Sequence, residues 1–250
     1  MKAMIFAAGL GTRLRPLTDT RPKALIDVGG VPMLERVLIR LKDCGVTDVV
    51  VNVHHFADMI CDFLHEYGIC DIMNVAVSDE REKLLDTGGG LLKAQSLLGD
   101  DDDILLYNAD ILTDFDIQPM VDWHKISGSD VSLLVGDRNT SRYLLLDDTN
   151  RMRGWCNSAT GEVRPAMPES TVRQLHHRAF GGVHIVSPSI FESLDDYGHE
   201  HGDAFSIMPF YIKECSRLKI TGYTPDRSYN WFDIGKPDSL ERARQSLSSI

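Results

Sequence analysis

The chain has 250 residues, of which 43% are hydrophobic and 25% are charged. This length and near-average composition fit one globular α/β domain and exclude collagen-like, low-complexity and largely disordered chains. The formal net charge of −11 has the wrong sign for a protein that holds a nucleic-acid backbone or an anionic membrane through bulk electrostatics. We therefore expect neither a nucleic-acid nor a membrane partner, and any basic patch must be local.

Cysteine and histidine spacing argues against a zinc site and against a disulfide framework. The five cysteines form no C-x-x-C pair, and the histidines, His184 among them, lack zinc-site spacings, so we expect them at the surface or at helix starts. The apolar run from Ala3 to Ala8 is too short for a signal-peptide core, and no run approaches the ~20 residues of a membrane span. We expect a soluble, cytoplasmic protein that begins with a buried strand.

Apolar runs without alternation recur along the first half of the chain and predict strands that are buried on both faces. These runs are Met4–Phe6, Val49–Val51, Met73–Val77, Ile104–Leu106 and Val131–Val135. Helical stripes lie between them, one from Met33 to Cys44 and one from Phe56 to Leu64. The βαβα order predicts a doubly wound, mostly parallel, Rossmann-like α/β sheet with right-handed crossovers.

After about residue 136 the pattern changes to shorter and more charged segments. Residues 143–146, 172–175 and 182–186 predict strands, which we expect to be antiparallel additions to the sheet. A helix near 204–215, a strand near 218–223 and a last helix from Pro237 complete the prediction. No linker or internal repeat interrupts the chain, so the sequence predicts a single domain over residues 1–250.

A polar loop from Gly9 to Pro22 follows the first predicted strand, at the sheet edge where ligands of open α/β sheets bind. The cations that gather here are Arg13, Arg15, Arg21 and Lys23. Asp19 is the only acid among them, and Gly9 and Gly11 allow backbone N–H groups to approach an anion closely. A solvated surface loop is the alternative, but oriented amides with clustered cations favour a phosphate site.

The glycines of this loop fit neither of two common phosphate-binding motifs. Leu14 stands where a dinucleotide fingerprint needs its third glycine, and no Gly-Lys-Ser/Thr follows for a P-loop. The string AAGLGTRLRPLT at residues 7–18, continued by RPKAL at 21–25, resembles instead the signature G-x-G-T-R-x-x-P-L-T…P-K-P of sugar-phosphate nucleotidyltransferases. Ala24 replaces the last proline. Members of that family join an NTP to a sugar 1-phosphate, which gives an NDP-sugar and pyrophosphate.

The resemblance implies a nucleotidyltransferase type A-like fold, in which residues 1–136 bind the nucleotide and residues 137–250 bind the sugar and supply closing helices. It implies catalytic roles for Arg13, at the β and γ phosphates with the loop backbone, and for Lys23, near the α-phosphate. The nucleotide-binding residues that it implies are Ala8, Gly9, Gly11, Thr12, Arg13, Lys23, Thr87, Gly88 and Gly89.

Two separated carboxylates predict a metal site. Asp110 comes directly after the strand 104–107, where α/β active sites gather, whereas Asp114 and Asp116 suit turn or cap roles. Asp233 lies in an aromatic setting, where a carboxylate needs a cation partner. Asn108-Ala109-Asp110 resembles the family's N-G-D metal segment, and residues 231–235 match its W-x-D-x-G segment. The resemblance implies that Asp110 and Asp233 bind Mg²⁺, a cation that prefers such oxygen ligands.

Three consecutive glycines at 88–90 precede a helical stripe, and ordering them is costly in conformational entropy. They could form a flexible helix start, but the cost indicates that something approaches their backbone. The family packs this loop beneath the nucleobase, and the D-T-G-G-G form at 86–90 is similar to that of bacterial N-acetylmuramic acid 1-phosphate uridylyltransferases. This likeness favours UTP and an amino-sugar 1-phosphate.

The acceptor side leaves alternatives open. Ser141-Arg142-Tyr143 resembles a segment of mannose 1-phosphate guanylyltransferases, although Leu144 replaces the glycine, so a GTP-dependent mannose- or heptose-1-phosphate enzyme is the alternative. A noncatalytic nucleotide or NDP-sugar sensor is the alternative from another class. By position we predict that the sugar phosphate contacts Asn108, Tyr143 and a turn at Gly181 and Gly182.

Overall fold

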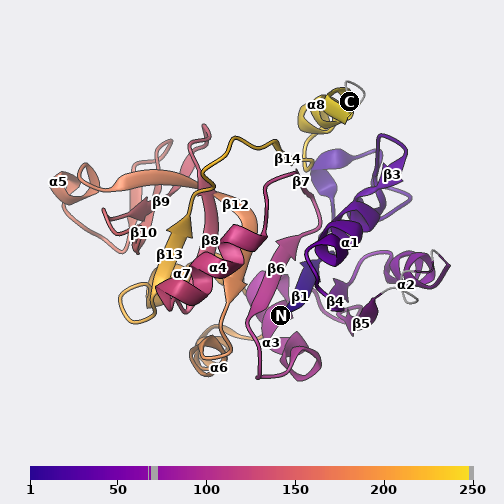
Figure 1. Cartoon of the computed structure of the whole chain (residues 1–250), viewed down its shortest axis with the longest axis horizontal. Coiled ribbons are helices and arrows are strands. Elements are labelled where there is room, and N and C mark those ends of the chain that lie inside the picture. The colour runs from indigo at the N-terminus through magenta and orange to yellow at the C-terminus, as the bar shows by residue number, and fades with distance from the viewer. Residues whose placement is uncertain (67, 69–72, 248–250) are drawn as a thin grey trace.

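The computed structural model describes residues 1–66, 68 and 73–247, and within them ten strands form one mixed sheet (Figure 1). Its parallel part has β1 (Lys2–Phe6) at the centre, flanked by β4 (Asp48–Val53) and β6 (Ile104–Asn108), with β5 (Asn74–Asp79) beyond β4. Apolar side chains cover both faces of β1 and β6, as the unbroken runs predicted.

The second half of the chain extends the sheet with antiparallel strands. The long strand β12 (His176–Val186) pairs with β6 through its last residues and with β9 (Arg142–Leu146) through its first. The remaining strands here are β8 (Val131–Gly136), β10 (Met152–Asn157), β11 (Glu162–Arg164) and β13 (Ile220–Tyr223). The predicted fold class is confirmed, with β13 as an exception in this half because it runs parallel to β8.

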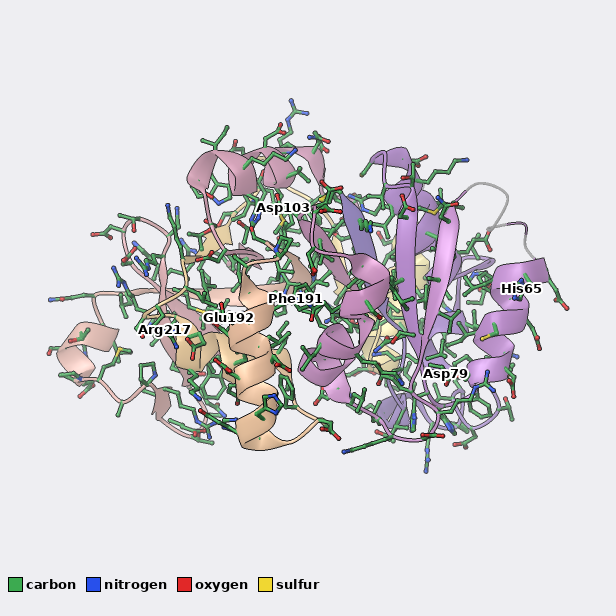
Figure 2. All side chains as sticks on the ribbon, turned by 90° about the horizontal axis from the view of Figure 1, so that it is seen from below. His65, Asp79, Asp103, Phe191, Glu192 and Arg217 are labelled. Carbon is green, nitrogen blue, oxygen red and sulfur yellow. The ribbon has the colours of Figure 1, made fainter. Side chains whose placement is uncertain are left out.

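Helices cover both faces of the sheet and bury a separate apolar cluster on each. One cluster contains side chains of α1 (Met33–Asp43), α2 (Ala57–Glu66) and α4 (Gln118–Ser127). The other contains side chains of α3 (Asp86–Leu98), α6 (Ile190–His201) and α7 (Ile207–Glu214). The two halves lie side by side, so that His65 on α2 and Arg217 after α7 lie toward opposite ends of the molecule (Figure 2).

The end of the chain returns to the first loop. The strand β14 (Trp231–Asp233) pairs with β7 (Ile111–Thr113), and α8 (Pro237–Leu247) follows it. Leu240 and Ala243 of α8 share a third apolar cluster with Leu14 of the first loop. The short strands β2 (Asp27–Val28) and β3 (Val31–Pro32) connect that loop to α1. This packing holds residues from both ends of the sequence at one edge of the sheet.

Several predicted elements were wrong or missed. Residues 172–175 are no strand, because α5 (Glu169–Val172) begins after Pro168 and local bonds such as Arg173 N–H to Glu169 C=O (3.0 Å) close it. Residues 88–90 lie inside α3 rather than in a loop before it. The helices α4 and α6 were missed, although α6 carries the helical stripe Ile190, Phe191, Leu194 and Tyr197. No helix of the described residues is long and apolar enough to cross a membrane.

Candidate active site

A cavity of about 440 Å³ opens at the carboxyl ends of β1 and β6. Its walls come from the first loop, from the start of α3, from residues 108–110 after β6 and from Gly235 near the chain's end. Ala8, Gly9, Gly11, Thr12, Arg13, Lys23, Thr87, Asn108 and Asp110 line it among the predicted site residues. The polar loop that the sequence singled out therefore does face a cavity at the expected edge of the sheet.

The first loop is held in shape by its own contacts. Gly11 adopts a left-handed backbone (φ +65°), and its carbonyl accepts a hydrogen bond from the Thr18 hydroxyl at 2.8 Å. Leu14 is buried against α8, which fixes the short helical turn at residues 12–14. At Gly9, by contrast, an added Cβ would meet no atom within 4 Å. The loop thus presents a fixed backbone with open space in front of Gly9.

Two carboxylates from distant parts of the chain meet beside this loop. Asp110 follows β6, and its carbonyl accepts a hydrogen bond from the Ile234 N–H at 2.9 Å. The β7–β14 ladder pairs Asp233 with Ile111, the residue after Asp110. Lys23 forms an ion pair with Asp110 across the first loop. The pairing of two short strands thus places Asp233 next to the predicted metal carboxylate.

Three charged groups converge on Gly235. A Cβ added to this glycine would lie 2.7 Å from the Asp233 Oδ1 and 2.8 Å from both the Arg13 Nη2 and the Lys23 Nζ. The Gly235 N–H also donates to Asp233 Oδ1 at 2.8 Å. No described residue forms an ion pair with Asp233, so its need for a cation partner stays a prediction, although Arg13 and Lys23 lie near the same glycine. Arg13, Lys23 and Asp110 line the cavity, whereas Asp233 lies beside Gly235 and outside that lining.

Comparison with known proteins shows which family the chain belongs to. Residues 2–145, more than half of the chain, match the family described as nucleotidyl transferase. The chain belongs to that family. It is 30% identical to the N-acetylmuramate alpha-1-phosphate uridylyltransferase of Caulobacter vibrioides (98% of this chain, 96% of the relative) and 31% identical to that of Neisseria meningitidis (98% and 97%). The enzyme is accordingly a sugar-1-phosphate nucleotidyltransferase.

Other relatives carry different names. The mannose-1-phosphate guanyltransferase of Debaryomyces hansenii is 28% identical over 95% of this chain, which spans 62% of that protein. Among solved structures, an apo UDP-glucose pyrophosphorylase aligns over 100% of this chain and 98% of its own with a TM-score of 0.80 at 15% identity. HddC from Yersinia pseudotuberculosis, complexed with GMP-PN, aligns over 98% and 99% with a TM-score of 0.75 at 22% identity. These two structures show the shared fold.

The glycines at 88–90 do not line the cavity of this nucleotidyltransferase. The Gly88 and Gly89 N–H groups donate to the Phe205 carbonyl at 2.9 and 3.2 Å, and a Cβ at Gly88 would clash with the Phe205 ring. What approaches the backbone of Gly88 and Gly89 is the enzyme's own connection between α6 and α7. The residues of this segment that face the cavity are Asp86, with a left-handed backbone (φ +60°), and Thr87.

The predicted sugar-phosphate residues lie in two places. Gly181 and Gly182 form no turn but stand where the pairing of β12 shifts register, and the Trp231 indole N–H donates to the Gly181 carbonyl at 2.9 Å. A Cβ at Gly182 would lie 3.1 Å from the Asn108 Nδ2, so these two residues adjoin. Tyr143 lies apart on β9, outside the lining of this cavity, and its hydroxyl accepts a hydrogen bond from the Thr140 N–H at 3.1 Å.

The sequence did not point to Asn52 in the cavity, to Glu80 beside it, or to Arg138 on the Trp231 ring. Asn52 lines the cavity. Its amide nitrogen donates a hydrogen bond to Glu80, which does not line the cavity. Arg138 stacks its guanidinium 3.6 Å from the Trp231 ring centre and donates to the Phe180 carbonyl at 2.7 Å. Burial lowers the pKa of Arg138, and the neighbouring Asp233 opposes that shift. The available signal was a polar residue interrupting or directly following an apolar run, as Asn52 does in Val49–Val53.

The structure also shows the contacts of the acids and histidines for which the sequence predicted no role in the site. Asp116 accepts from the Gln118 N–H at 3.1 Å at the start of α4, as expected. Asp114 instead accepts from the distant Asn230 N–H at 2.7 Å, so the expected turn or cap role was wrong for it. Among the described residues no group of three or more histidines, cysteines or acids could hold a metal. The expectation of a surface or helix-start role was wrong for His184, which β12 buries between aromatic rings.

Proposed function

We propose that this nucleotidyltransferase transfers a uridylyl group from UTP to an amino-sugar 1-phosphate and releases pyrophosphate. The observation that carries the proposal is the convergence of Arg13, Lys23 and Asp233 on Gly235, beside Asp110. The UTP assignment is supported by the D-T-G-G-G segment and by two uridylyltransferases that match over nearly their whole length. We assign the product to the precursors of cell wall or polysaccharide.

In the proposed reaction, the phosphate oxygen of the sugar attacks the α-phosphorus of the NTP in line, and pyrophosphate leaves toward the first loop. A phosphate monoester has a second pKa near ~6, so the attacking oxygen is ionised at neutral pH and needs no base. Arg13 and Lys23 supply fixed positive charge at the leaving phosphates and the α-phosphate, which lowers the barrier by electrostatic stabilisation.

The backbone of the first loop supplies the remaining phosphate donors. The Ala7 and Ala8 N–H groups already donate to Asn52 at 2.7 and 3.3 Å. We therefore assign phosphate contacts to the N–H groups from Gly9 to Arg13, and assign Ala8 a contact through its methyl or carbonyl group. The open space at Gly9 suits a phosphate that approaches the chain closely.

Asp110 and Asp233 would hold a magnesium ion. Mg²⁺ is bound by one or two carboxylates together with substrate phosphates, and the two carboxylates brought together by β7 and β14 fit that pattern. When bound, the ion would neutralise charge on the phosphate oxygens. Lys23, paired with Asp110, would keep that carboxylate oriented toward the cavity.

The acceptor is assigned to the side of the cavity where Asn108 adjoins the register shift of β12. Its carboxamide would donate to a hydroxyl or phosphate oxygen, and the carbonyls near Gly181 and Gly182 would accept from sugar hydroxyls. Tyr143 would contact only a larger acceptor, since β9 places it outside this cavity.

A second candidate is a guanylyltransferase that uses GTP with mannose or heptose 1-phosphate. The Ser141-Arg142-Tyr143 segment and the guanyltransferase relatives favour it. The two candidates differ in the base edge that the cavity must hydrogen-bond, and the wrong base leaves buried polar groups unpaired at a cost of about 1–3 kcal/mol per group.

The deciding experiment mixes the enzyme and Mg²⁺ with UTP and GTP in competition, across a panel of hexose, amino-sugar and heptose 1-phosphates, and measures pyrophosphate and NDP-sugar. We expect UDP-sugar to form first with an amino-sugar 1-phosphate. Faster consumption of GTP would replace the proposal by the second candidate. Tight nucleotide binding without pyrophosphate release from any pair would indicate a sensor.

A further inference from the structure

A buried hydrogen-bond chain joins two walls of the nucleotide cavity. The Asn52 Oδ1 accepts from the Ala7 and Ala8 N–H groups at 2.7 and 3.3 Å, and its Nδ2 donates to the Glu80 Oε1 at 2.8 Å. The other Glu80 oxygen accepts from the Leu85 N–H at 3.0 Å. Ala7 and Ala8 begin the phosphate loop, and Leu85 precedes the segment that includes Thr87, so the chain spans both walls.

The side chains of Asn52 and Glu80 are almost completely buried. Asn52 is 2% exposed and Glu80 is 1% exposed, and no described residue forms an ion pair with Glu80. Gly90 closes the seal from α3, because a Cβ there would lie 2.8 Å from the Glu80 Oε1 and 3.0 Å from the Asn52 Nδ2. Burying a carboxylate without a cation costs free energy, so the hydrogen bonds that Glu80 accepts must compensate for its lost hydration.

The direction of each hydrogen bond follows from the two ends of the chain. Both ends are backbone N–H donors, which cannot be reversed. The carboxamide must turn its oxygen toward Ala7 and Ala8, so its NH₂ group faces residue 80. That residue must then accept at both of its terminal oxygens, and only a carboxylate does so. Glutamine has the same shape as glutamate but leaves one donor facing another donor in either orientation.

The location of the negative charge is a second feature. Asn52 lines the cavity, whereas Glu80 lies behind it and does not line it. The same set of hydrogen bonds would be satisfied by an aspartate at 52 and a glutamine at 80. That reversed order would place the negative charge at the wall that faces the anionic phosphates of the NTP. The observed order places a neutral amide there.

We propose that Asn52 and Glu80 are positioning residues that fix the phosphate loop relative to the start of α3, with the carboxylate kept one residue behind the cavity wall. The inference depends on the proposed function only for its nucleotide readout. Neither side chain needs to touch the substrate, since the polar atoms of both are already bonded within the protein.

The test compares Glu80→Gln, Asn52→Asp and the double variant Asn52→Asp/Glu80→Gln, by thermal unfolding and by KM for each substrate. We expect each single variant to lose several degrees of Tm and to raise the KM for the NTP about tenfold. Glu80→Gln places two buried hydrogen-bond donors against each other, and Asn52→Asp places two buried carboxylates against each other. The KM for the sugar phosphate should change far less. Glu82→Gln, the same substitution at an exposed position two residues on, is the matched control.

The double variant separates positioning from simple packing. It restores every hydrogen bond, so its Tm should return close to that of the wild type. Its KM for the NTP should stay raised, and the excess should shrink as salt screens the charge now at the cavity wall. If one single variant fails to fold, recovery of folding in the double variant still supports the hydrogen-bond order.

Three results would overturn the inference. A Glu80→Gln enzyme with wild-type Tm and NTP KM would remove the positioning role. A double variant whose Tm loss equals the sum of the single losses would refute the hydrogen-bond order. A double variant with wild-type NTP KM at low salt would refute the charge placement. If the wild type turns over no substrate pair, the proposed function fails. The Tm values of the variants and calorimetric titrations with UTP and GTP still test this inference.

Discussion

Two glycine-rich segments lie beside the cavity, and their environments are opposite. At Gly9 an added Cβ would meet nothing within 4 Å, so the space before the backbone is open to a ligand. At Gly88 and Gly89 the same addition would meet Phe205 and Asp203 of the α6–α7 connection. A glycine-rich segment therefore leaves room for something to approach the backbone. It does not indicate whether that is a substrate or another part of the chain.

The segment at Gly88 and Gly89, which we call the filled segment, shows how the second half of the enzyme supports the first. The Phe205 carbonyl accepts from two N–H groups of α3, and the Ile207 N–H donates to the Thr87 hydroxyl at 3.0 Å. The connection between α6 and α7 thus fixes the start of α3, where Asp86 and Thr87 face the cavity. In the proposed function, the chemistry belongs to the loop at Gly9 and its charged residues, while the segment at Gly88 and Gly89 supplies stability and position.

The largest effects are expected where the loop at Gly9 meets the carboxylates. Asp110→Asn and Asp233→Asn should each lower kcat by about 10³-fold or more, because each removes negative charge that would hold the metal near the reacting phosphates. Tm should change little, since asparagine retains the shape. Pyrophosphate release at saturating Mg²⁺ measures the loss. Asp116→Asn removes the same charge from an exposed cap and should retain wild-type turnover, whereas normal turnover in either site variant would refute its assignment.

Arg13 should follow in size. Arg13→Ala should lower kcat/KM by about 10²-fold, because one preorganised charged donor at a leaving group contributes about 3 kcal/mol. Arg15, in the same loop, has a 66% exposed side chain that pairs with Asp19 at 3.3 Å, so Arg15→Ala is the matched control. Equal losses in the two variants would show that the loop acts through its overall charge and not through the residue that adjoins Gly235.

The two glycine segments can be compared directly with one substitution. Gly88→Val should lower stability by about 3 kcal/mol, because the new side chain overlaps the Phe205 ring in a packed interior. Gly9→Val should leave Tm unchanged and raise the KM for the NTP, because it fills space that is open to the phosphates. Denaturant unfolding and steady-state kinetics on both variants give the result. Unchanged stability with a raised NTP KM in Gly88→Val would instead place that glycine against the nucleotide.

The sequence predicted the parallel core and the loop that carries the cations, because burial on two faces and local charge are properties of short segments. It did not predict the partner of Gly88, since Phe205 lies more than a hundred residues away and only packing brings it there. Asn52 and Glu80 were missed for a similar reason. Each is an isolated polar residue in or after an apolar strand, and their significance is visible only when both are buried together.

The smallest effect that we predict is a pH dependence of the free energy of unfolding, which arises from His184 beside the apolar cluster that includes α7. His184 contacts Phe180 and Tyr211, the latter on α7, which follows the connection that holds Gly88. Neither ring nitrogen of His184 has a hydrogen-bond partner among the described residues, and burial lowers its pKa to about 3. A histidine that must stay neutral in the folded state is a liability in acid, because the unfolded chain binds the proton first.

The unfolded pKa of histidine is near ~6.5, so between that pH and about 3 the unfolded state carries the extra proton and stability falls as pH falls. By pH 5 the loss from this residue should be about 2 kcal/mol. His184→Phe removes the titrating group and fills a similar space among aromatic rings, so its stability should fall less than that of the wild type between pH 7 and pH 5. Denaturant unfolding at both pH values measures the difference. If the two proteins lose the same stability between pH 7 and pH 5, His184 can be protonated without disturbing α7. The packing of α7 around this histidine would then be less tight than the packing of Phe205 on Gly88 indicates.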